Sequence, residues 1–165
     1  MRHDVIVSQY LAALKMLRAA VEACPETLWD RSSDRNRFWV IAYHTVYHAH
    51  LYLSPSQETF EPWEVEVKGH PAFGRDHLGD WRKLSAEDVY SKADILAYCD
   101  HVTELVAPLV QAVDFDASSG FDWLRFSRGE AHFDNIRHIQ HHAGQLIERL
   151  RQEVDQAVDW IASGR

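Results

Sequence analysis

Hydrophobic residues recur at three- and four-residue steps along four long stretches of the chain, which is the period of an amphipathic α-helix. The first stretch shows it best, because its apolar stripe consists of Ile6, Tyr10, Leu14, Leu17 and Val21. The pattern predicts helices over residues 4–23, 37–53, 92–113 and 129–152. No stretch alternates apolar and polar residues for long enough to predict a strand.

Local signals mark the ends of these helices. Pro25 follows the first, and Pro55 follows the second. Ser91 and Ser127 are each followed by an acidic residue three positions later, a spacing typical of a helix N-terminal cap. Pro108 falls inside the third helix and predicts a kink or break near residue 106.

The elements together predict an all-α fold, an antiparallel four-helix bundle, that forms a single domain over residues 1–165. Residues 26–37 are expected to be a polar connection, and residues 155–161 to form a short C-terminal helix. The connection between the second and third helices is long. Its part over residues 54–84 contains three prolines, three glycines and several aromatic residues, so we expect it to pack on the body with a short helical turn inside.

Composition narrows the class of protein. Hydrophobic residues make up 46% of the 165 residues, which excludes disorder for most of the chain. The net charge of −8 disfavours binding to nucleic acid or to anionic lipid. No run of 18 apolar residues and no signal-peptide pattern is present, and Cys24 and Cys99 form no C-x-x-C motif. These features predict a cytoplasmic protein with two ordinary thiols.

The unusual feature is 11 histidines. Five of them are scattered and are expected to be surface or loop residues: His3, His70, His77, His101 and His132. The other six form two clusters, one in each of two predicted helices: His44, His48 and His50 in the second, and His138, His141 and His142 in the fourth.

Helical geometry sorts the clustered histidines. Residues four apart lie about 40° from each other around a helix, so His44 shares a face with His48, and His138 shares one with His142. His44 lies in the middle of an apolar arc and should point inward. His138 and His142 lie beside the apolar stripe of their helix, whereas His141 lies about 60° further toward the polar side.

Two inward histidine pairs in one helical core favour a metal site. The alternative is that these residues are ordinary core histidines bonded to buried carbonyls. The chain has no Glu-x-x-His pairs and no His-Glu-x-x-His motif, so it supports neither a di-iron carboxylate site nor a zincin protease. Asp134, one turn before His138, could bond to a ligand imidazole or be a surface carboxylate. Aromatic residues could line a pocket or belong to the core: Tyr43, Tyr47, Trp63 and Trp81.

Two of these segments resemble motifs of the DinB-like (DinB/YfiT) superfamily. One is HIQHHAGQL, which starts at His138, and the other is FWVIAYHT, which starts at Phe38. The resemblance spans most of the chain in helix order and approximate length. It implies a four-helix bundle in which one histidine of the second helix and two of the fourth hold a divalent metal. Carried onto this chain, the ligands are His44, His138 and His142.

His48 departs from the family pattern, because it places a second histidine one turn after His44. It is either an additional or substitute ligand or a pocket residue beside the site. The resemblance implies a metal-dependent enzyme, either a hydrolase or a transferase that uses a low-molecular-weight thiol, with an unknown small-molecule substrate. The metal would be Zn, Ni or Fe, since imidazole suits all three. We also expect a homodimer. The alternative is a non-catalytic bundle that binds metal or other proteins, because no motif places a carboxylate beside the histidines.

Overall fold

The computed structural model describes residues 3–63 and 89–165. Its regular elements in these ranges are helices, and one isolated bridge joins Ser118 and Ser127. The all-α prediction is therefore confirmed for the described residues. None of the helices in these ranges combines the length and the apolar character needed to cross a membrane. The helices are α1 (His3–Ala23), α2 (Glu26–Trp29), α3 (Phe38–Leu53), α4 (Lys92–Gln111) and α5 (Arg128–Val154).

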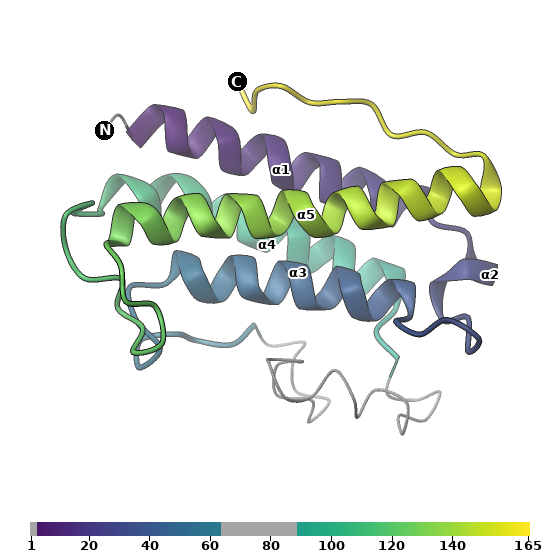
Figure 1. Cartoon of the computed structure of the whole chain (residues 1–165), viewed down its shortest axis with the longest axis horizontal. Helices are drawn as coiled ribbons and strands as arrows, with labels where there is room; N and C mark the ends of the chain where they lie inside the picture. Colours follow the sequence, from purple (N-terminus) through teal and green to yellow (C-terminus); the bar gives the residue numbers. More distant parts are fainter. Residues whose placement is uncertain (1–2, 64–88) are drawn as a thin grey trace.

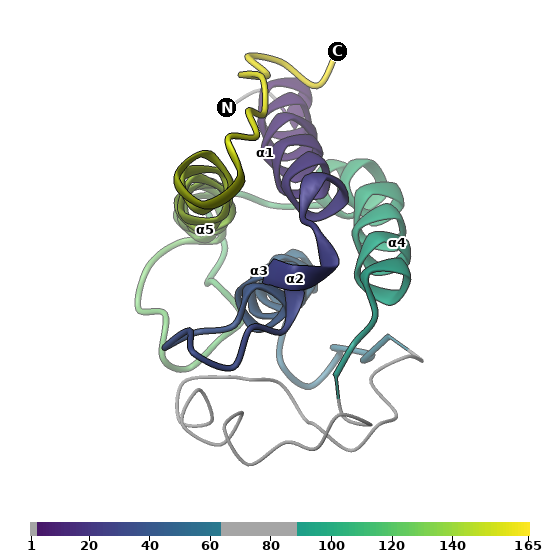
Figure 2. The ribbon, with the colours of Figure 1, turned by 90° about the vertical axis from the view of Figure 1, so that its right-hand side faces the viewer.

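The four long helices surround a shared apolar core, with α1 and α3 each packed against both α4 and α5 (Figure 2). Helices α1 and α5 run in one direction, and α3 and α4 run in the other (Figure 1). The pairs α1–α4 and α3–α5 are therefore antiparallel, and the pairs α1–α5 and α3–α4 are parallel. Because α3 and α4 are parallel, the end of α3 and the start of α4 are separated by about the length of α3, roughly 24 Å, so a tight turn cannot join them.

Helix α3 is buried on most sides. Its aromatic residues contribute to the core, where the Tyr43 ring stacks on the Tyr90 ring with 4.6 Å between centres. Trp63, at the start of the long connection, stacks on Tyr98 of α4 at 4.7 Å. The segment after α3 thus packs on the body of the protein up to residue 63. Residues 54–63 contain no helix, and residues 64–88, where the expected helical turn could fall, lie outside the described residues.

The tail does not form the predicted short C-terminal helix. Asp155 adopts a left-handed conformation with φ of 52°, and the Gln156 amide donates to the Leu150 carbonyl, which ends α5. The tail then runs back along α1 (Figure 1), where the Gly164 amide donates to the Ser8 carbonyl at 3.0 Å. The Gly164 amide, which in a helix would donate to a carbonyl of the same segment, donates to α1 instead. The periodicity of so short a segment could not reveal this partner.

Two further expectations are wrong in detail. The expected break near residue 106 is absent, because α4 continues past Pro108 to Gln111. The proline lies in the last turn, where the Ala112 amide still donates to the Pro108 carbonyl. The segment after Pro25 contains the short helix α2, which buries Leu28 and Trp29. Proline suits the start of a helix because its missing N–H needs no partner there.

The caps expected from the sequence are present. Ser91 and Asp94 form a reciprocal capping box at the start of α4. At the start of α5, the Ser127 hydroxyl accepts from the Glu130 amide at 3.2 Å. These caps fix where α4 and α5 begin.

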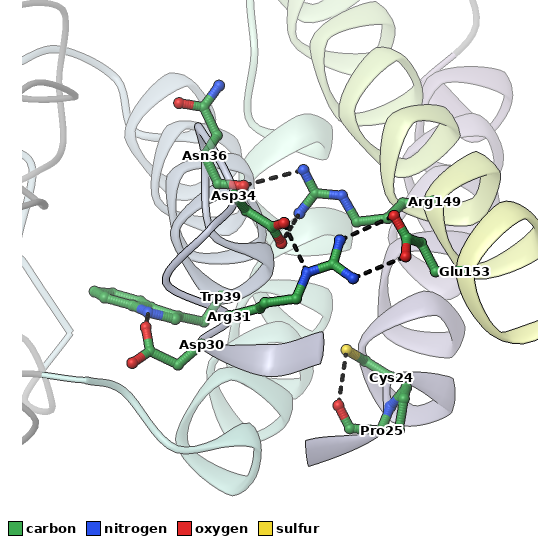
Figure 3. Close-up of polar contacts among 9 residues, drawn as sticks. All are labelled: Cys24, Pro25, Asp30, Arg31, Asp34, Asn36, Trp39, Arg149 and Glu153. Carbon is green, nitrogen blue, oxygen red and sulfur yellow. Dashed lines mark hydrogen bonds and ion pairs between the residues drawn. The ribbon is translucent and has the colours of Figure 1, made fainter. Parts of the chain in front are cut away.

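An ion network formed by Arg31, Asp34, Arg149 and Glu153 fastens the loop before α3 to the end of α5 (Figure 3). Arg31 donates to Asp34 at 2.7 Å and, through two nitrogens, to Glu153 at 2.7 and 2.9 Å. Arg149 donates to the Asn36 carbonyl at 3.0 Å and lies 3.6 Å from Asp34. The hydrogen bonds from Arg31 hold the pKa of Glu153 below its usual value. These contacts fix the entry into α3 against α5.

Candidate metal centre

Three histidines from two helices converge where α3 and α5 cross. His44 comes from α3, and His138 and His142 come from successive turns of α5. One nitrogen from each ring lies within 4.8 Å of the other two. The Nε2 atoms of His44 and His138 are 3.1 Å apart. The structure thus brings together the three side chains that the sequence predicts to be ligands.

One pair of donors has the spacing that a divalent ion needs. Two imidazole nitrogens, each about 2.0–2.1 Å from zinc at tetrahedral angles, are about 3.3 Å apart. The 3.1 Å between the nitrogens of His44 and His138 is close to that value. Among the residues in the described ranges, this is the one group of three or more histidine, cysteine or carboxylate side chains close enough to share an ion. Its donors are all imidazoles, which suit zinc, nickel and iron.

The electrostatics of the site favour neutral imidazoles. Burial, and to a smaller extent the neighbouring histidines, lower the pKa of His138 to about 2. Burial also lowers the pKa of His142 to about 4, against a hydrogen bond with Gln145 that raises it. A neutral ring keeps one nitrogen lone pair for a metal. Both rings are therefore ready to coordinate at neutral pH.

Gln145 orients one of the proposed ligands. The Nδ1 of His142 lies 2.8 Å from Oε1 of Gln145, and an amide oxygen can only accept, so Nδ1 carries the proton. That leaves Nε2 of His142 as the free donor. The Gln145 amide nitrogen in turn lies 3.1 Å from Nε2 of His141. The sequence signal for this contact was the Gly-Gln pair that follows the histidines in the resemblance motif.

His48 and His141 flank the three donors. The His48 ring, which is 8% exposed, lies 4.4 Å from the His44 ring centre and 5.4 Å from that of His138. It lies beside the donors but is outside the group whose atoms are all within 4.8 Å. Its role as an additional or substitute ligand stays a prediction. His141 is exposed, with its ring 4.9 Å from His142, which places it at the rim as expected.

His132 is buried, contrary to the expectation that it is a surface residue. It has no exposed surface, and its Nδ1 lies 2.9 Å from the Tyr10 hydroxyl. Burial lowers its pKa to about 4. His132 is buried because α1 packs parallel to α5 and covers the first turns of α5. A helix wheel for α5 alone shows the position but not the neighbour that covers it.

The other histidines take no part in the site. His50 is buried on the α4 side of α3, with Nδ1 3.1 Å from the Tyr98 hydroxyl. His101 is half-buried and packs on Trp63. His3 bonds to the Val113 carbonyl at 3.1 Å. His70 and His77 lie outside the described residues.

The aromatic residues that could line a pocket divide between the core and the site. Tyr43 belongs to the core, and Trp63 packs against α4. Tyr47 packs edge-on against His48 with 5.4 Å between ring centres, so it borders the histidines. Trp81 lies outside the described residues. Asp134 forms an ion pair with Arg137 at 3.8 Å on the surface, which matches its reading as a surface carboxylate.

Sequence reasoning did not single out Asn135. It has no exposed surface, and its amide nitrogen donates to the Ala49 carbonyl at 3.0 Å, a contact that joins α5 to α3. The available signal was its spacing, because it lies three residues before His138 and therefore on nearly the same helix face.

Comparisons with protein-family models, with curated proteins and with solved structures each find no match to this chain.

Proposed function

We propose that this chain is a DinB-like four-helix-bundle metalloenzyme whose divalent ion is held by His44, His138 and His142. The reaction is hydrolysis or the transfer of a group to a low-molecular-weight thiol. One observation carries the proposal: three imidazoles from α3 and α5 offer donor atoms within 4.8 Å of one another. The two sequence segments that resemble the DinB-like superfamily contain these same three residues.

Three protein ligands suit catalysis better than storage, because structural zinc sites fill all four positions with side chains. When bound, a divalent ion in this site would lower the pKa of a water or thiol ligand and polarise a substrate carbonyl. His44, His138 and His142 would leave at least one position open for such a ligand. The identity of the ion follows from availability, and zinc, nickel and iron all fit the donors.

The chain's own residues supply orientation. Gln145 holds the proton of His142 on Nδ1 and so presents Nε2 to the shared point. Tyr47 and His48 border the same point on the α3 side and shape access to it. His141 stands at the exposed rim, where it accepts from the Gln145 amide and so helps to fix the orientation of that amide.

A non-catalytic metal-binding bundle is the second candidate. It is favoured by the absence of any carboxylate from the donor group found in the described ranges, because a general base beside the ion is common in metal-dependent hydrolases. The two candidates differ in the coordination of the ion. An open position occupied by solvent supports the enzyme, and a position filled by His48 supports the binding protein.

Metal analysis of protein purified without a histidine tag tests the proposal. We expect about one equivalent of a transition metal in the wild type and a large loss in His142→Ala. His101→Ala is the matched control, because it removes an imidazole of α4 that packs on Trp63 outside the donor group, and it should retain the metal. Equal metal content in wild type and His142→Ala would contradict the proposed site. Sedimentation of the same samples tests the homodimer, which we also propose.

A further inference from the structure

A hollow on the exposed side of α5 reaches one of the proposed ligands. Its volume is about 500 Å³, and it is lined by Asp134, Arg137, His138, Gln140 and His141. This volume is within the range of small-molecule sites, about 300–1,000 Å³. Because His138 is both a proposed ligand and part of the lining, a molecule in the hollow would lie beside the metal centre.

Arg137 is the one arginine or lysine in this lining. Its side chain is 81% exposed, and its Nη1 lies 3.8 Å from Oδ1 of Asp134, which is beyond hydrogen-bond distance. Within the described residues, its guanidinium makes no hydrogen bond. A guanidinium carries five N–H donors in a planar fork that matches the two oxygens of a carboxylate. These donors are therefore available to a molecule in the hollow.

His141 offers a second donor on the same face of α5. It follows Arg137 by four residues, so the two side chains are neighbours on the helix surface. The Nε2 of His141 lies 3.1 Å from the amide nitrogen of Gln145, which can only donate, so Nε2 accepts and the ring proton is on Nδ1. The lining thus combines a cation and an N–H donor.

The charges of the lining favour an anion with a single charge. Asp134 lies close enough to Arg137 to cancel part of its charge, so a doubly charged phosphate would be repelled by the Asp134 carboxylate. The net charge of −8 on the chain disfavours highly charged anions in the same way. A carboxylate carries one charge and can accept from both Arg137 and His141.

We infer that Arg137 determines the substrate class of this site: it binds a carboxylate of the substrate, with Nδ1–H of His141 as the second donor. This inference rests on the proposed function. The substrate is then a small carboxylic acid whose other end reaches the ion. Arg137 contacts the substrate rather than the metal, so its loss should change selectivity and leave metal affinity unchanged.

Two small thiols test the inference on cobalt-loaded protein, because a thiolate bound to Co²⁺ gives a charge-transfer absorption band. Mercaptoacetate carries a carboxylate, and mercaptoethanol carries a neutral hydroxyl in its place. In the wild type, mercaptoacetate should bind more tightly. The ratio of the two affinities should fall about fivefold in Arg137→Gln, a modest factor because solvent screens an exposed guanidinium. In Asp134→Asn the ratio should rise about twofold, because the competing carboxylate is removed.

Arg151→Gln is the matched control, because it removes an exposed arginine of α5 that does not line the hollow. Its ratio of affinities should equal that of the wild type. Titration with Co²⁺ should give the same metal affinity for all four proteins. A loss of cobalt affinity in Arg137→Gln would contradict a role in selectivity alone.

The outcomes separate this inference from the proposed function. If the wild type binds no cobalt, or if neither thiol changes the cobalt spectrum, there is no metal centre with an open position, and both fail. If both thiols bind and Arg137→Gln keeps the wild-type ratio of affinities, the proposed metal centre stands and the inference about Arg137 is overturned.

Discussion

Two clusters of polar side chains connect α5 to its neighbours. One joins α5 to the loop before α3 and the other joins α5 to α3 itself, and the two clusters differ in the charges that they combine. The ion network at the C-terminal end of α5 combines two arginines with two carboxylates, so each charge faces an opposite charge (Figure 3). The histidine group in the middle of α5 combines three side chains of one kind, with no carboxylate among its donors. In the first cluster, the partners lower each other's energy. In the second cluster, His44 lowers the pKa of both His138 and His142, in the same direction as burial.

This difference separates a structural cluster from a candidate site. The ion network needs nothing further, since its charges are matched within the chain. The histidine group has no opposite charge among its donors, and a bound cation would be the one group that all three imidazoles contact. Stability should therefore respond mainly to changes in the ion network, and metal affinity should respond to changes among the histidines.

The largest expected change in metal binding is the loss of affinity in His44→Ala. The substitution removes one of the three proposed ligands, and the donor group in the described residues contains no fourth member. Zinc affinity should therefore fall at least 100-fold, on the order of 2.7 kcal/mol. The increase in unfolding temperature caused by zinc should disappear with it. Calorimetric titration with zinc and thermal unfolding with and without zinc check this. Retained affinity would show that the donor group is not the binding site.

The next effect concerns pH and the buried histidines outside the site. The folded-state pKa of His132 is about 4, below its ordinary value of about 6.5. Between these values the unfolded chain binds more protons than the folded one, so stability falls as pH falls from 6.5 to 4. His132 alone should contribute about 3 kcal/mol to this loss. Urea unfolding of metal-free protein across this range measures it, and His132→Leu should show a shallower slope. An equal slope in both proteins would contradict the account.

A moderate effect is expected from Asp34→Asn in the ion network. The Asp34 side chain is 9% exposed and faces both Arg31 and Arg149. Loss of its charge leaves two guanidinium groups with one carboxylate fewer, which should destabilise the fold by about 1–2 kcal/mol. Zinc affinity should be the same as in wild type. A fall in zinc affinity larger than the fall in stability would show that the two clusters are not independent.

The smallest effect is expected from Glu153→Gln. Its side chain is 40% exposed, so solvent and salt screen its pair with Arg31. The unfolding temperature should fall only slightly at low ionic strength, and the difference from wild type should nearly vanish in high salt. Thermal unfolding at two salt concentrations checks this. A large, salt-independent loss would show that the network is less solvent-accessible than the structure indicates.

The sequence predicts the site better than it predicts its surroundings. His44, His138 and His142 could be chosen because the face of a helix that a residue occupies depends only on its spacing, and capping serines fix where α4 and α5 start. The burial of His132 could not be predicted, because it depends on α1 packing parallel to α5. The extended path of the tail could not be predicted either, because it depends on the hydrogen bond between Gly164 and Ser8, which is far away in the chain. The spacing of Asn135 places it on nearly the same helix face as His138, but its contact with the Ala49 carbonyl depends on how α5 packs on α3 and could not be predicted.

The direct test of the metal centre is a crystal structure of tag-free protein with data collected on both sides of the absorption edge of the metal present. The account predicts one anomalous peak, bonded to Nε2 of His44, His138 and His142, with at least one coordination position not filled by the protein. A peak held by other residues, or no peak at these three histidines in protein that carries metal, would contradict it.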